Sequence, residues 1–127
     1  MSDTDSPLDV FGKLVTERLR DAALEKFDSL SHGKLKAPSL RSLQVALASL
    51  KPRERDIFRR CLVSSVDSAI HDLLFSLQEG EYEGTSVQVI VGGSDVNELS
   101  DGLHGEPYGD EGWISRFSKF GVPPKEA

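Results

Sequence analysis

The fold is decided by residues 52–80, which read PRERDIFRRCLVSSVDSAIHDLLFSLQEG. Apolar residues recur in this stretch every three or four positions, which places them on one face of an α-helix. They are Ile57, Cys61, Leu62, Val66, Ala69, Ile70, Leu73, Leu74 and Leu77. Pro52 suits the first turn of a helix, and Gly80 suits the left-handed position that ends one. We therefore expect one long helix whose apolar face, Cys61 included, lies in the core.

Two further helices are predicted before this one. Ser6-Pro7 is typical of a helix start, and apolar residues follow at helical spacing from Leu8 to Leu30. A second apolar stripe runs from Leu40 to Leu50, and Pro52 then separates it from the long helix because the residue before a proline avoids helical angles.

The pattern changes after Gly84. Residues 87–91 are β-branched and partly alternating, which predicts a strand, and the sequence Gly-Gly-Ser-Asp at 92–95 predicts a turn. Residues 96–100 either return as the second strand of a hairpin or begin a short helix. The glycine-rich residues 100–112 predict a loop, after which Asp110 is expected to cap a short helix. The apolar side of that helix is Trp113, Ile114, Phe117 and Phe120.

These elements predict an α+β fold, with three amphipathic helices packed against a short β-hairpin and a short C-terminal helix. We find no internal repeat and no linker, so residues 1–127 are expected to form a single domain. Residues 1–6 and 122–127 are expected to be flexible tails.

The composition indicates a globular protein of the cytoplasm. Hydrophobic residues make up 38% and charged residues 28% of the 127 residues, which is too apolar for general disorder. No apolar run approaches the roughly 18 residues that a membrane span needs, and the acidic N-terminus lacks a secretory signal. A single cysteine excludes an internal disulfide and a multi-cysteine metal cage.

The net charge of −6 is unevenly distributed. Residues 1–80 hold 12 acidic and 12 basic residues, whereas residues 81–127 hold 9 acidic and 3 basic residues. The 55 residues between Arg60 and Arg116 contain no lysine or arginine at all. Because phosphate groups are bound by lysine and arginine, this half of the chain is not expected to bind nucleic acid.

One short stretch resembles a DNA-binding element. Residues 50–57, Leu-Lys-Pro-Arg-Glu-Arg-Asp-Ile, are similar to the opening of the helix-turn-helix region of sigma-type transcription regulators. A helix-turn-helix needs a short turn before its recognition helix, but residues 61–78 continue without glycine or proline and carry Asp67 and Asp72. The expectation therefore remains no nucleic-acid partner.

The candidate site lies in the loop and includes two aromatic rings. Loops tend to carry function, and tyrosine and tryptophan are favoured at the centre of protein interfaces. The residues predicted to bind a partner are Asp101, His104, Glu106, Tyr108, Asp110, Glu111 and Trp113. Small acidic inhibitors of the immunity or antitoxin type have this character, so the leading hypothesis is a module that docks a basic protein partner.

The alternative hypothesis is a small metal-dependent hydrolase. Imidazole and carboxylate four residues apart share a helix face and can bind a metal together. The alternative ligand set is Asp67, His71, Asp72, Asp101 and His104. Its doublet His71-Asp72 resembles that of metal-dependent phosphohydrolases. The sequence leaves open whether the chain is an enzyme, although it favours binding without a cofactor. A homodimer that pairs apolar helix stripes across a two-fold axis is a third expectation.

Overall fold

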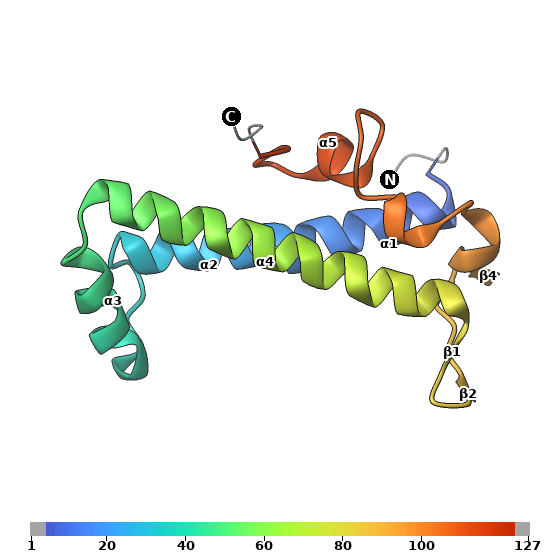
Figure 1. Cartoon of the computed structure of the whole chain (residues 1–127), viewed down its shortest axis with the longest axis horizontal. Coiled ribbons are helices and arrows are strands. Elements are labelled where there is room, and N and C mark those ends of the chain that lie inside the picture. Colours follow the sequence, from blue (N-terminus) through green and yellow to red (C-terminus); the bar gives the residue numbers. More distant parts are fainter. Residues whose placement is uncertain (1–4, 124–127) are drawn as a thin grey trace.

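The computed structural model describes residues 5–123 and is built on two long antiparallel helices (Figure 1). The first is continuous from α1, Pro7–Val15, through a π-helical turn, Thr16–Asp21, into α2, Ala22–Ser31. The second is α4, Pro52–Glu79. A 3-10 turn, Pro38–Leu40, and α3, Arg41–Ala48, join them at one end of the molecule. The three predicted helices are thus confirmed.

The helix ends follow local chemistry. The hydroxyl of Ser6 accepts a hydrogen bond from the backbone nitrogen of Asp9 at 3.1 Å, which satisfies a free donor of the first turn. Gly80 ends α4 with a φ of +78°, a left-handed conformation that costs glycine little.

Two small hairpins follow α4 at the other end of the molecule. Strand β1, Glu81–Tyr82, pairs with β2, Thr85–Ser86, and β3, Ile90–Val91, pairs with β4, Ser94–Asp95. Both hairpins turn through two residues with positive φ, which matches the twist of paired strands. The predicted strand at 87–91 is thus only its last two residues, and the first hairpin was not predicted.

The rest of the chain forms a layer over one face of the helix pair. It contains two 3-10 turns, Val96–Leu99 and Leu103–Gly105, and the short helix α5, Trp113–Phe117. Asp110 does not cap α5, because Gly112 occupies the N-cap position and no side chain caps the helix. Phe120 lies beyond the helix end.

The main core lies where this layer meets the helix pair. Its buried members are Phe11, Ile70, Leu74, Val96, Leu103 and Trp113. Burying each such side chain contributes roughly 1.5–3 kcal/mol. Cys61 was wrongly expected in this core and is exposed, because it lies about half a turn from the buried Val63 and from Arg59, which binds Asp28 of the first helix.

The result is an α+β fold, as predicted. None of the helices within residues 5–123 combines the length and apolarity needed to cross a membrane. Of the expected tails, residues 1–4 and 124–127 lie outside the described residues, whereas Ser6 caps α1.

Candidate functional site: a groove beside the long helix

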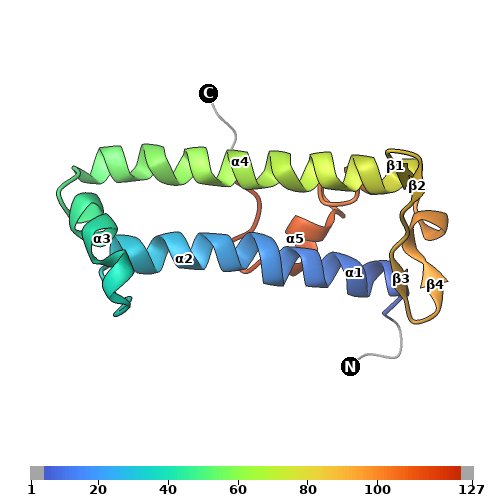
Figure 2. The same ribbon diagram turned by 90° about the horizontal axis from the view of Figure 1, so that it is seen from below.

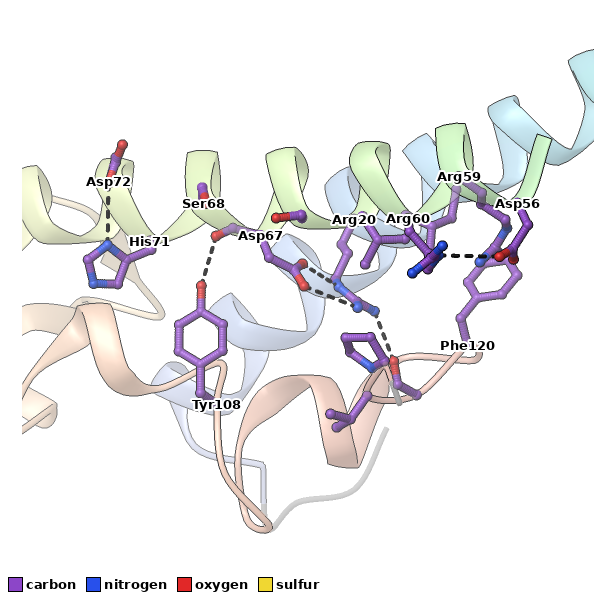
Figure 3. A pocket seen from close by; sticks show the side chains of 16 residues that line it. Arg20, Asp56, Arg59, Arg60, Asp67, Ser68, His71, Asp72, Tyr108 and Phe120 are labelled. Carbon is purple, nitrogen blue, oxygen red and sulfur yellow. Dashed lines mark hydrogen bonds and ion pairs between the residues drawn. The ribbon is translucent and has the colours of Figure 1, made fainter. Parts of the chain in front are cut away.

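A groove with a volume of about 930 Å³ runs between α4 and the C-terminal segment (Figure 3). One wall is the face of α4 from Asp56 to Asp72, and the opposite side is formed by Tyr108 and residues 120–123. Arg20 and Leu24 from the first helix also line it. The groove therefore brings together three segments that are distant in the sequence.

Arg20 joins these segments. Its guanidinium donates hydrogen bonds to Asp67 Oδ1 at 2.7 Å and Oδ2 at 3.4 Å, to Ser118 Oγ at 3.2 Å and to the carbonyl of Gly121 at 3.1 Å. Its side chain is 1% exposed, whereas that of Asp67 is 17% exposed. Because a buried charge without partners is costly, this set of contacts fixes α4 and the C-terminal segment on the first helix.

The π-helical turn places a second buried charge beside Arg20. Asp21 accepts hydrogen bonds from Ser118 Oγ at 2.6 Å and from the backbone nitrogen of Lys119 at 3.0 Å. The hydrogen bonds of a π-helix span five residues instead of the four of an α-helix, so the turn accommodates an extra residue, and such turns are frequent at functional sites. Two consecutive charged residues, Arg20 and Asp21, are thereby buried and both bind the C-terminal segment.

The other arginines of the groove have partners within the basic part of the chain. Arg59 Nε donates to Asp28 Oδ1 at 2.8 Å, and Arg60 Nε lies 3.2 Å from Asp56 Oδ2. The ring of Phe120 lies 5.4 Å from the guanidinium carbon of Arg59. Apolar and paired polar groups thus alternate along the groove, which suits a protein segment better than one small ion.

Four rings meet at the end of the groove, and we call them the ring cluster: His71, Phe75, His104 and Tyr108. The centroid of the His104 ring lies 5.4 Å from that of His71 and 5.6 Å from that of Phe75. The Tyr108 ring lies 6.3 Å from His71, and its hydroxyl donates to the carbonyl of Asp67 at 2.8 Å. Phe75 is 46% and Tyr108 is 38% exposed, so the cluster presents apolar surface to solvent.

The environment of Tyr108 changes its acidity. Partial burial, followed by the negative charge of Asp67, raises the pKa of Tyr108 above the usual value of a tyrosine. The phenol therefore stays protonated and can donate its hydrogen bond over a wider pH range.

The loop residues predicted to bind a partner occupy different environments. His104 is half-buried, with Nδ1 2.6 Å from Gln78 Oε1, and Glu106 accepts a hydrogen bond from Ser100 Oγ at 2.5 Å. Asp101, Asp110 and Glu111 are exposed. The loop thus keeps three carboxylates in solvent while its histidine anchors it to α4.

Trp113 does not belong to a contact surface. The side chain is completely buried and packs edge-on against Phe11, with ring centroids 5.7 Å apart. A Cβ added at Gly12 would come within 2.4 Å of its ring, so the tryptophan rests directly on the backbone of α1. The buried ring of Trp113 therefore holds the C-terminal layer to the helix pair and cannot contact a partner, whereas Phe75, which was not predicted, is exposed at the surface.

The five residues of the metal alternative do not form a ligand group. Within residues 5–123, no three histidine, cysteine, aspartate or glutamate side chains converge in a way that could hold a metal ion. Asp67 binds Arg20, and His71 Nδ1 lies 3.3 Å from its neighbour Asp72 rather than from Asp67. Within the described residues, the predicted ligands Asp67, His71, Asp72, Asp101 and His104 thus do not form a metal site.

Sequence reasoning missed Arg20, Asp21 and Phe75. The signal for the first two was an adjacent pair of opposite charges between the apolar residues Leu19 and Ala22 of a predicted helix. Phe75 carried no separate signal, because it was one of many apolar residues on the long helix.

Known proteins offer no assignment. The chain matches no protein-family model, no curated protein and no solved structure.

Proposed function

We propose that the chain is a small protein-binding module, of the immunity or antitoxin type, that docks a basic partner beside the ring cluster. The main support for this proposal is the set of eleven acidic residues between Arg60 and Arg116, a stretch without lysine or arginine. A surface with this charge attracts a basic protein and accelerates its association.

The ion pairs support this proposal because the nearest cations are engaged elsewhere. Arg59 and Arg60 pair with Asp28 and Asp56, outside the acidic stretch. Arg116 Nη1 lies 3.0 Å from Asp9 Oδ1, and Lys119 pairs with Glu25. Asp67 is the member of the stretch that the buried Arg20 compensates.

The ring cluster would supply the apolar centre of the contact. Half-exposed aromatic rings that charged residues surround are typical of residues that dominate binding energy. Asp72 extends beside His71 with its side chain 83% exposed, and Asp110 and Glu111 follow Tyr108 closely in the loop. A partner could thus place aliphatic surface on the rings and basic side chains at these carboxylates.

The test uses the full chain as bait in an extract of its host cells. We expect the wild type to recover one basic protein in a one-to-one ratio with the bait. The control Lys34→Gln/Lys36→Gln, at the end of the molecule that carries α3, should recover the same protein. The triple variant Asp101→Asn/Asp110→Asn/Glu111→Gln and the Tyr108→Ala variant should lose it. With the purified pair, raising the salt from 50 to 500 mM should slow association at least about tenfold.

Three results would contradict this assignment. They are recovery of no protein, recovery that ignores the carboxylates and Tyr108, and an association rate that does not depend on salt.

A further inference from the structure

The two-helix layer has one face that the C-terminal layer does not cover. Figure 2 views the molecule from this side, with α1, α2 and α4 in front and α5 behind them. On α4, the residues that contact the C-terminal layer include Asp67, His71 and Gln78. At about 100° per residue, Phe58, Leu62, Ala69 and Leu73 lie roughly half a turn from them.

The first helix contributes to the same face. Gly12 and Asp9 touch Trp113 and Arg116 of the C-terminal layer, and Leu14 lies about half a turn from both. Asp21 and Glu25 bind Ser118 and Lys119, and Phe27 lies toward the opposite side. We call this surface the open face, and its apolar members are Leu14, Phe27, Phe58, Leu62, Ala69 and Leu73.

The open face exposes more apolar surface than a separate two-helix layer should. Leu14 is 56%, Phe58 is 53% and Leu73 is 54% exposed. Aligned apolar side chains of this size on neighbouring helices mark a surface that another element covers. Two such helix pairs placed face to face would form a four-helix bundle.

Charge along the long axis identifies the covering element. Residues 26–60, at the end that carries α3, hold nine basic and three acidic residues. At the end that carries the hairpins, residues 79–98 hold five acidic and no basic residues, and residues 5–14 of the first helix hold two acidic and one basic residue. A second copy turned end for end would lay its basic end over the acidic end of the first, twice in one symmetric interface.

From these observations we infer that the chain forms an antiparallel homodimer through the open face. Its two-fold axis is perpendicular to α4, because a parallel arrangement would bring like charges together at both ends. The inference is independent of the proposed function, since the ring cluster lies on the covered side of the helix pair and stays exposed in the dimer.

The first test is the mass of the purified full chain by sedimentation equilibrium. We expect a dimer, at twice the 13.9 kDa of the chain, in the wild type and in the control Leu99→Glu, which changes a leucine of similar exposure outside the open face. Leu73→Glu and Ala69→Glu should raise the dimer dissociation constant about a hundredfold or more, because a buried charge without a partner is costly. Circular dichroism checks that each variant folds, and two variants guard against the failure of one.

The second test decides orientation. In a Cys61→Ser background, donor dye is attached at Ser42→Cys in α3 and acceptor dye at Thr85→Cys in β2, on separate preparations that are then mixed. The 28 residues of α4 separate these ends by about 42 Å. An antiparallel dimer transfers energy between mixed copies more efficiently than between copies labelled at the same site. A monomer, a dimer insensitive to both glutamates, or stronger transfer between like sites would overturn the inference.

Discussion

At the scale of the residue, the contact between Gly12 and Trp113 fixes how the C-terminal layer sits on the helices. The tryptophan ring occupies the space that any side chain at position 12 would need. The sequence suggested Trp113 as an interface residue because it stands next to an acidic loop, and nothing in its spacing revealed the glycine opposite.

We expect Gly12→Ala to destabilise the protein. Overpacking costs about 1–3 kcal/mol, against about 1 kcal/mol gained from the better helix propensity of alanine. Because the added Cβ would come within 2.4 Å of the ring, overpacking should lie at the upper end of that range, which leaves a net loss of about 2 kcal/mol in urea unfolding. Gly105→Ala is the control, because a Cβ there meets nothing within 4 Å. Equal stability of the two variants would show that the tryptophan does not rest on α1.

Tyr108 gives a prediction about pH. Its pKa is raised in the folded chain, so the unfolded chain loses this proton first as the pH rises. The resulting stabilisation is complete below the ordinary pKa of tyrosine and disappears as the pH rises through the higher pKa of the folded state. We expect the stability of the wild type to fall more steeply than that of Tyr108→Phe in this alkaline window, as measured by thermal unfolding. Parallel curves for the two proteins would argue against a raised pKa of Tyr108 in the folded chain.

At the scale of the element, the π-helical turn and the segment 118–121 depend on each other. We expect Arg20→Ala to cost about 3–5 kcal/mol, because it leaves Asp67 without its partner at a poorly solvated position. Arg60→Ala, which alters a pair with both side chains more than half exposed, should cost less than about 1 kcal/mol. Chemical unfolding measures both free energies, and similar costs for the two variants would mean that Arg20 does not hold α4 and the C-terminal segment on the first helix.

The helices were predictable from sequence, whereas the arrangement around the groove was not. The three helices were located by the spacing of their apolar residues, by Pro7 and Pro52 at helix starts and by Gly80 at a helix end, because these signals are local. The hairpin at Glu81–Ser86 was not predictable because Glu83 occupies the first position of its turn with a positive φ. Asparagine, aspartate or glycine is the usual residue at that position. The groove joins residues about 100 positions apart, such as Arg20 and Gly121, and no local pattern reports that contact.

At the scale of the whole molecule, the elongated shape separates the basic and acidic residues of the chain toward opposite ends. The sequence already showed the acidic stretch, but only the antiparallel helices place its hairpin residues 81–95 at the end opposite α3 (Figure 2). The same field supports both proposals, a basic partner on the covered side and an inverted second copy on the open face. Because the two proposals use opposite faces and different variants, they can fail separately.

The π-helical turn accommodates one more residue than a regular α-helix would hold between α1 and α2. Deleting that residue would restore α-helical winding and leave α1 and α2 in nearly the same relative orientation, because a π-helical turn absorbs a single inserted residue. The contacts of Gly12 with Trp113 and of Asp28 with Arg59 could then both persist. The cost would fall on the turn itself, where Arg20 and Asp21 together hold the C-terminal segment.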